Sequence, residues 1–192
     1  SEARIPIRDH GCRFGDGVFE GIRVTERGSF RLDDHMKRLE TAGRAVGIGA
    51  EAVFDRAREA ACETTRAFGR QEGYLRLIVT RGGGALGIDP ATCPEPAIVC
   101  IAAGALAPDP EREARGLSLV TSSLRRPPAD VLDPRVKSLN YLNNILAKIE
   151  AKKVGFQEAL MLNDKGEVAE CTGDNVFILS KGTLLTPPLD AG

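Results

Sequence analysis

The stretch Val136-Lys137-Ser138-Leu139-Asn140-Tyr141-Leu142-Asn143-Asn144 organises this sequence. Three prolines stand just before it: Pro127, Pro128 and Pro134. Because proline breaks helices, we predict that Lys137 stands at the start of a helix, with Tyr141 one turn further on. An amine held at the end of an ordered element suits Schiff-base chemistry, since burial or a neighbouring cation lowers the pKa of a lysine and frees the nucleophile. Most lysines are solvated, so spacing alone leaves an ordinary surface lysine open as well.

Composition and charge exclude several classes of protein. The 192 residues suffice for one large domain or two small ones, and 42% hydrophobic with 28% charged residues is typical of globular proteins. The net charge of −1 shows no excess of basic residues that would favour binding to nucleic acid or to an acidic membrane surface. We find no apolar run of bilayer-spanning length and expect no signal peptide. The five scattered cysteines form no C-x-x-C pair, so we expect neither a zinc site nor a disulfide framework. Free cysteines are typical of a reducing environment, so we expect a cytoplasmic setting.

The first half of the sequence mixes strands and helices without regular βαβ order, which predicts an α+β fold. Residues 14–25 begin glycine-rich and end as a strand, and a turn at 26–29 predicts a hairpin with residues 30–32. Asp33 or Asp34 is expected to cap a helix that ends at Gly47. The apolar face of that helix would carry Met36, Leu39, Gly43 and Val46. Further elements are predicted as a helix at about 50–68 and strands at 74–80 and 97–102.

A proline-containing and charged stretch at residues 105–116 predicts a linker between two domains. We therefore expect a small N-terminal α/β domain at 1–104 and the beginning of a larger domain at 117–192. The second domain would hold strands at 117–122, 158–162, 167–170 and 175–179 and a helix through 144–151. The sequence opens on a strand-like stretch at 4–7 and stops in a loop-like one at 187–192, so we expect residues to be missing from both ends.

Two sequence patterns that suggest cofactor or metal binding have weak support. Residues 82–87 satisfy G-x-G-x-x-G after a strand, but a dinucleotide site needs a helix directly afterwards. The prolines that follow forbid that helix, so we predict a mobile loop. His10 and His35 have no partner at metal-ligand spacing, so no metal is expected, and His35 is interpreted as a structural hydrogen-bonding residue.

Three charged residues allow both a structural and a functional interpretation. Arg38 lies off the apolar stripe of its helix and is either solvated or a phosphate ligand. Arg76 shares a strand face with Tyr74 and either forms a structural ion pair or binds a carboxylate. Glu170 ends a short strand, where it either accepts backbone donors or keeps a heterocyclic nitrogen protonated.

Taken together, these residues resemble the class IV (fold type IV) pyridoxal-phosphate-dependent aminotransferases, and within them the branched-chain amino acid aminotransferases. The matching segments follow the order of that family and lie at 9–11, 14–23, 32–39, 74–76, 80–82, 136–143, 169–170 and 173–177. The resemblance implies a two-lobed fold type IV architecture, with a small α/β N-terminal lobe and a larger C-terminal lobe that is incomplete here. The sequence stops before the family's Gly-Ile-Thr-Arg segment, which helps to bind the phosphate.

The resemblance also implies roles for individual residues. Lys137 would form the Schiff base with pyridoxal 5'-phosphate and act as general base and acid. The other implied cofactor ligands are Arg38 for the phosphate, Tyr141 for the ring oxygen, Glu170 for the ring nitrogen, and Asn175. The implied substrate contacts are Tyr74, Arg76, Phe19, Gly21 and Arg23. Phe14 stands where many branched-chain enzymes carry tyrosine, and Cys171 replaces a common glycine.

The implied activity is a transamination between a branched-chain L-amino acid and 2-oxoglutarate, in a homodimer or higher homo-oligomer. D-Amino acid aminotransferases and aminodeoxychorismate lyases share the lysine and the glutamate, so both remain alternatives within the family. A non-catalytic remnant of the fold is the alternative from a different class.

Overall fold

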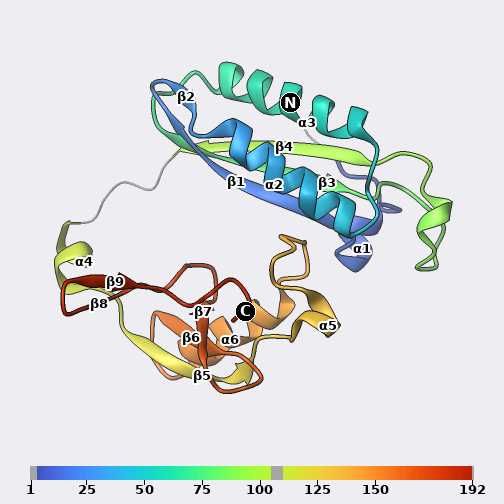
Figure 1. The fold of residues 1–192 in the computed structure, drawn as a ribbon. Coiled ribbons are helices and arrows are strands. Elements are labelled where there is room, and N and C mark those ends of the chain that lie inside the picture. The colour runs from blue at the N-terminus through green and yellow to red at the C-terminus, as the bar shows by residue number, and fades with distance from the viewer. Residues whose placement is uncertain (1–3, 105–109, 192) are drawn as a thin grey trace. The chain divides into compact units, whose positions relative to one another are not determined.

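The computed structural model describes residues 4–104 and 110–191 and contains both helices and strands, which confirms the α+β prediction (Figure 1). The chain forms two compact units. Unit 1 comprises the described residues up to Gly104 together with Val136–Asn140, and unit 2 comprises residues 110–135 and 141–191. Of the predicted linker, residues 105–109 lie outside the described residues, while Pro110–Arg115 form helix α4.

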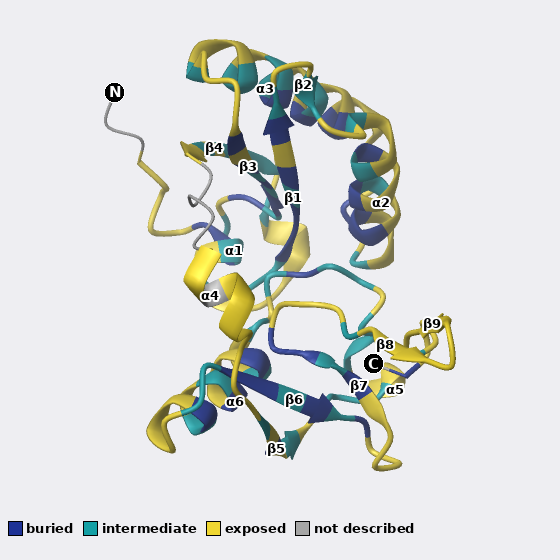
Figure 2. Cartoon of the chain, turned by 90° about the vertical axis from the view of Figure 1, so that its left-hand side faces the viewer, coloured by how far each residue is buried: buried dark blue, intermediate teal, exposed yellow. Residues whose placement is uncertain are grey.

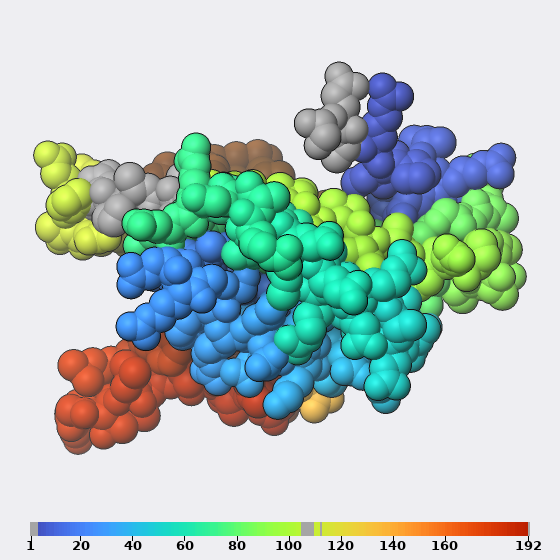
Figure 3. All heavy atoms as spheres, turned by 90° about the horizontal axis from the view of Figure 1, so that it is seen from above, coloured from blue at the N-terminus to red at the C-terminus, as the bar shows by residue number. Residues whose placement is uncertain are grey.

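Unit 1 is built on an antiparallel sheet with the strand order β2-β1-β3-β4. Its strands are β1 (Gly17–Thr25), β2 (Gly28–Ser29), β3 (Gly73–Thr80) and β4 (Ala97–Gly104). Two helices, α2 (Leu32–Ala45) and α3 (Glu51–Phe68), pack against one face of this sheet, and Figure 3 shows that face with α2 in blue and α3 in teal. A short helix α1 (His10–Phe14) precedes β1, and a 3₁₀ turn η1 (Pro90–Thr92) precedes β4.

Side-chain alternation along the strands gives the sheet a covered and an open face. The covered face holds the core of unit 1, which Figure 2 shows in dark blue. From the sheet it contains Val18, Ile22, Val24, Leu75, Leu77 and Val79, and from the helices Met36, Leu39, Phe54, Ala57 and Ala61. Glu20 lies on the same face as Val18 and Ile22 and is fully buried. The intervening residues of β1 and β3 therefore point to the open face.

Unit 2 contains a mixed three-stranded sheet of order β5-β6-β7 and a separate β8–β9 hairpin. Its strands are β5 (Leu119–Arg125), β6 (Glu158–Leu162), β7 (Val168–Cys171), β8 (Ile178–Ser180) and β9 (Thr183–Leu185). Strand β5 runs parallel to β6, which requires a crossover, and helix α6 (Leu142–Lys153) supplies it and packs on both strands. Ala147, Ala151, Ala159 and Met161 form the buried core, and the short helix α5 (Ala129–Leu132) follows β5.

Several local predictions were wrong. Residues 30–32 do not form a strand: α2 begins at Leu32, and Arg31 precedes it with a left-handed φ of 49°. Asp33 and Asp34 therefore lie inside the first turn, where their charges favour the helix dipole instead of capping the helix. Residues 4–7 are not a strand, and the strand predicted at 175–179 begins only at Ile178, as β8 of the β8–β9 hairpin.

Candidate functional site

Lys137 does not start a helix, because α6 begins only at Leu142. The segment Val136–Asn140 instead pairs antiparallel with the edge of β1 that the short β2 leaves open. The amide of Phe19 donates to the carbonyl of Lys137 at 3.0 Å, and the amide of Leu139 donates to the carbonyl of Gly17 at 2.9 Å. Sheet hydrogen bonds thus fix the backbone of Lys137 within unit 1.

A group of aromatic and basic side chains surrounds Lys137 on the open face of the sheet. Lys137 Nζ lies 4.7 Å from the ring centroid of Phe19, and the guanidinium carbon of Arg76 lies 4.4 Å from the same centroid. The Arg76 guanidinium carbon is also 5.4 Å from the ring centroid of Tyr74. Cations at these distances are attracted by an aromatic face. The structure therefore brings together four of the predicted site residues: Lys137, Phe19, Tyr74 and Arg76.

Gly21 lies opposite Arg76 in the sheet and makes room for Tyr74. A Cβ atom at Gly21 would lie 2.0 Å from Tyr74 Oη, so the phenol can occupy its position only above a glycine. Arg23, the next predicted residue on this face, is exposed and forms a long 4.0 Å ion pair with Glu72. The sheet thus positions a phenol and a guanidinium side by side, both suited to a carboxylate.

Arg38 is positioned by a carboxylate that the sequence analysis did not single out. Its Nε and one terminal nitrogen donate to the two oxygens of Glu20 at 2.5 and 2.6 Å. His35 Nδ1 lies 2.9 Å from Glu20 Oε2, which agrees with the structural role predicted for His35. Glu20 is fully buried, whereas the side chain of Arg38 is 54% exposed. Because Glu20 belongs to the covered face, Arg38 is anchored from the helical side of the sheet.

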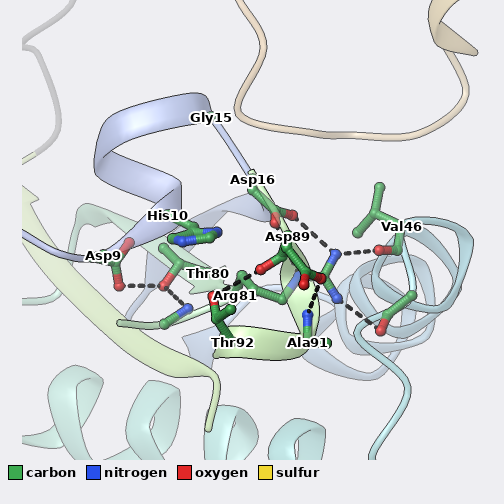
Figure 4. Close-up of polar contacts among 12 residues, drawn as sticks. Asp9, His10, Gly15, Asp16, Val46, Thr80, Arg81, Asp89, Ala91 and Thr92 are labelled. Carbon is green, nitrogen blue, oxygen red and sulfur yellow. Dashed lines mark hydrogen bonds and ion pairs between the residues drawn. The ribbon is translucent and has the colours of Figure 1, made fainter. Parts of the chain in front are cut away.

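Arg81, from the segment 80–82 that matches the family, forms a clamp within unit 1 (Figure 4). Its guanidinium donates twice to the carboxylate of Asp16 at 3.0 Å, to the carbonyl of Gly47 at 2.8 Å, and to that of Val46. These contacts tie the end of β3 to the start of β1 and to the end of α2. The Arg81 side chain is therefore occupied by structural contacts.

In unit 2, Glu170 forms an ion pair with a residue that the sequence analysis also missed. A terminal nitrogen of Arg126 lies 3.0 Å from Glu170 Oε1. The other terminal nitrogen of Arg126 donates to Asn144 Oδ1 at 2.9 Å, and Asn144 Nδ2 donates to the carbonyl of Thr172 at 2.8 Å. The carboxylate of Glu170 is thus paired with Arg126, directly after β5, and Arg126 is held in turn by Asn144 in the first turn of α6.

A second carboxylate, Glu158, supports the turn that follows Glu170. It accepts hydrogen bonds from the hydroxyl of Thr172 and from Lys148. Burial alone would raise the pKa of Glu158, but the hydrogen bonds from Lys148, Thr172 and the Ala159 amide outweigh it and lower that pKa. Glu158 therefore joins α6, β6 and the turn after β7.

The remaining predicted residues of unit 2 lie outside the helices and strands. Tyr141 is the residue before α6, and its carbonyl accepts the amide of Ile145 at 2.9 Å. Asn175 is exposed between β7 and β8. A cavity of about 310 Å³ in unit 2 is lined by residues that include Pro127, Arg135 and Lys165, but by none of the predicted site residues. We therefore do not assign the chemistry to that cavity.

The described part of the chain offers neither a metal-binding cluster nor a membrane span. Within residues 4–104 and 110–191, no group of three or more histidine, cysteine, aspartate or glutamate side chains is arranged to hold a metal ion. In the same residues, every helix is too short or too polar to cross a bilayer. All five cysteines are free thiols, and burial raises the pKa of Cys171.

The sequence matches a known family over most of its length. The family model described as "Amino-transferase class IV" matches residues 17–192. The chain belongs to the class IV aminotransferases. A putative branched-chain-amino-acid aminotransferase of Methanocaldococcus jannaschii is 45% identical over 98% of this chain and 64% of that protein. The chain thus spans slightly less than two thirds of the length of this relative.

Two solved structures show the same fold. A branched-chain amino acid aminotransferase from T.th., solved with pyridoxamine 5'-phosphate, has a TM-score of 0.87 and 34% identity, over 96% of this chain and 63% of that one. A putative 4-amino-4-deoxychorismate lyase from Legionella pneumophila has a TM-score of 0.85 and 26% identity, over 100% of this chain and 68% of that one. The two-lobed fold type IV architecture implied by the resemblance is thereby confirmed.

Proposed function

We propose that this chain is part of a pyridoxal-phosphate-dependent transaminase that moves an amino group between a branched-chain L-amino acid and 2-oxoglutarate. The observation that carries the proposal is the group on the open face of unit 1. There Lys137 and Arg76 both lie within 5 Å of the Phe19 ring centroid, and Tyr74 lies beside Arg76. A primary amine next to a carboxylate-binding pair is what the chemistry of α-amino acids requires.

The donor set fits the cofactor and its substrates. Lys137 offers an amine for an aldehyde, and its segment is held on β1 by two sheet hydrogen bonds, one of them to the carbonyl of Lys137. Gly21 leaves a cradle that a Cβ atom would fill, beneath the phenol of Tyr74. Arg38, whose guanidinium is anchored on Glu20 from the helical side of the sheet, is proposed to hold the phosphate, as the family resemblance implies. When bound, pyridoxal 5'-phosphate would supply an electron sink for the electrons left on the substrate α-carbon.

In this proposal the residues of unit 1 bind the substrate and move one proton. Arg76 and Tyr74 hold the α-carboxylate, and a fixed carboxylate orients the α-carbon toward Lys137. Lys137 Nζ takes the proton from that α-carbon and later returns a proton. Phe19 and Gly21 border an apolar space for an aliphatic side chain, and Arg23 stands at its rim.

The residues of unit 2 have proposed roles toward the cofactor ring. Glu170 would accept a hydrogen bond from a protonated ring nitrogen, and Tyr141 would donate to the ring oxygen. Asn175 is proposed as a further cofactor contact. The ion pair between Arg126 and Glu170 supports the first of these roles, because it favours an ionised carboxylate.

The test uses the complete polypeptide that carries these 192 residues. Addition of pyridoxal 5'-phosphate should produce a visible absorption band, and borohydride should fix the cofactor covalently. Lys137→Ala should abolish the covalent product while leaving the folded far-ultraviolet spectrum unchanged. A borohydride-stable adduct in Lys137→Ala would show that another amine carries the cofactor, and the proposal would fail.

The similarity to a putative 4-amino-4-deoxychorismate lyase supports a second candidate function. A panel of L-leucine, D-alanine and aminodeoxychorismate separates the candidates, each with 2-oxoglutarate present. We expect oxo-acid formation from L-leucine. Release of pyruvate from aminodeoxychorismate without turnover of leucine would favour the lyase. The homodimer and the cytoplasmic setting remain predictions.

A further inference from the structure

We propose that Arg126 is the positioning residue that holds the carboxylate of Glu170 ionised and correctly oriented for the cofactor ring nitrogen. The inference rests on the proposed function, in which Glu170 meets that nitrogen. Neither the sequence motifs nor the resemblance pointed to Arg126. Its role is inferred from its contacts in unit 2 alone.

The ion pair between the two side chains is shielded from water. Arg126 Nη2 lies 3.0 Å from Glu170 Oε1, and the two side chains are only 11% and 27% exposed, respectively. An ion pair in such surroundings is less screened by water and salt than one at the surface. The pair therefore fixes the carboxylate more firmly than an exposed ion pair would.

Arg126 is itself held from several directions. Its second terminal nitrogen donates to Asn144, which is 5% exposed and is tied in turn to the carbonyl of Thr172. The amide of Arg126 donates to the carbonyl of Leu162 at 2.9 Å, so its backbone is bonded to β6. Two prolines follow Arg126 directly and restrict its backbone further. The guanidinium is thus pre-oriented before any ligand arrives.

The hydrogen bonding of the Arg126 guanidinium is not the one that stability alone would favour. Arg126 Nε is buried and has no hydrogen-bond partner among the described residues. A buried donor without a partner costs stability and is uncommon in folded proteins. Arg126 therefore keeps its hydrogen bond to Asn144 and its ion pair with Glu170 while its buried Nε has no hydrogen-bond partner among the described residues.

The chemical consequence concerns the proton on the ring nitrogen. A guanidinium beside Glu170 stabilises the negative carboxylate, so a proton shared between the carboxylate and the ring nitrogen stays on the nitrogen. The carboxylate of Glu170 has two oxygens, so an ion pair through Oε1 is compatible with a hydrogen bond between the carboxylate and the ring nitrogen. Without Arg126 the carboxylate would rotate more freely and hold the ring nitrogen less well.

The experiment compares Arg126→Gln, Arg126→Lys and Arg125→Gln in the complete polypeptide. Arg125 is the matched control, because it is the adjacent arginine and is exposed. The readouts are the dissociation constant for pyridoxal 5'-phosphate, the pH dependence of the bound cofactor's absorption, and the melting temperature of the cofactor-free protein. We expect Arg126→Gln to raise the dissociation constant about tenfold and to shift the absorption profile by about one pH unit. Arg126→Lys should recover part of both effects, and Arg125→Gln should change neither.

A double variant separates positioning from a structural role. If Arg126 acts through Glu170, then Arg126→Gln should add nothing to the dissociation constant of Glu170→Gln. Additive effects, or an unchanged dissociation constant in Arg126→Gln, would overturn the inference while leaving the proposed function intact. If Arg126→Gln does not fold, the same comparison is made with Arg126→Lys. Failure of the unsubstituted protein to bind the cofactor would instead overturn the proposed function.

Discussion

Glu20 is the residue on which the helical side of the candidate site depends. Its carboxylate contacts both His35 and Arg38, and it has no exposed side-chain surface. A buried carboxylate is tolerated only while its partners neutralise it and satisfy its oxygens. The charge of Glu20 and the position of Arg38 are therefore coupled.

We predict that Glu20→Gln lowers the free energy of unfolding by about 2 kcal/mol, because it takes away the counter-charge that Glu20 presents to the guanidinium of Arg38. Urea unfolding followed by circular dichroism measures this change. Glu40→Gln is the control, since Glu40 pairs with Arg44 on the exposed side of α2. The control should cost about 0.5 kcal/mol or less. Equal losses in the two variants would contradict the coupling.

Gly21 gives a second prediction at the scale of single residues. The methyl group of Gly21→Ala would overlap Tyr74 Oη, so the phenol must turn away from the open face. We expect the KM for the amino donor to rise about tenfold while the melting temperature changes little, because the displaced group is the end of a flexible side chain. Steady-state kinetics and thermal unfolding measure the two quantities.

The control for Gly21→Ala is Gly49→Ala, where an added Cβ atom would meet nothing within 4 Å. In a Tyr74→Phe background the Gly21→Ala substitution should raise the KM by a smaller factor, because the most severe overlap, with the hydroxyl oxygen at 2.0 Å, is gone and the closest remaining ring carbon lies 2.8 Å away. An unchanged KM in Gly21→Ala would mean that Tyr74 does not contact the donor.

Elements with a clear local pattern were predictable from the sequence. Helix α3 and strands β3 and β6 carry strong helical or strand periodicity and were confirmed almost to their ends. Helix α1 was missed because it has only five residues and no apolar stripe. The start of α2 was misplaced because Arg31 adopts a left-handed φ that favours glycine.

Contacts between distant residues could not be predicted in the same way. The pairing of Val136–Asn140 with β1 joins segments more than a hundred residues apart, so no local period signals it. Glu20 gave a usable signal, since it is a charge at a core-facing position of an apolar strand. Arg126 gave none, because its partner Glu170 is distant in the sequence.

Glu158 supports a prediction about the elements of unit 2. Its pKa in the folded protein lies below the ordinary 4.5, so its contribution to stability is present above pH 4.5 and is lost as the pH falls through the lowered value. Glu158→Gln should therefore reduce the free energy of unfolding by about 1–2 kcal/mol near neutral pH. The difference from the unsubstituted protein should shrink in acid.

Urea unfolding at several pH values between about 7 and about 3.5 measures the difference. Glu113→Gln, at an exposed position of α4, is the control and should run parallel to the unsubstituted protein at every pH. A constant difference between Glu158→Gln and the unsubstituted protein down to the lowest pH would refute the linkage.

At the scale of the whole molecule, the chain leaves unit 2 after Arg135, adds Val136–Asn140 to the sheet of unit 1, and returns to unit 2 at Tyr141. The position of Lys137 therefore depends on the stability of a sheet that is formed mainly by residues before position 105. Residues close to it in sequence, such as Tyr141, belong to a different cooperative unit. The position of Lys137 should accordingly respond to changes in the core of unit 1.

Hydrogen exchange of the amides tests this dependence, because local opening reports the stability of the unit to which an amide belongs. Leu77→Ala and Met161→Ala remove fully buried side chains from the cores of units 1 and 2, at a cost of about 2–5 kcal/mol each. We expect Leu77→Ala to accelerate exchange of the Leu139 amide as much as that of the β1 amides. Met161→Ala should accelerate the amides of α6 and leave Leu139 unchanged. Faster exchange of Leu139 in Met161→Ala would instead tie the lysine segment to unit 2, and the stability of unit 1 alone would no longer determine where Lys137 is held.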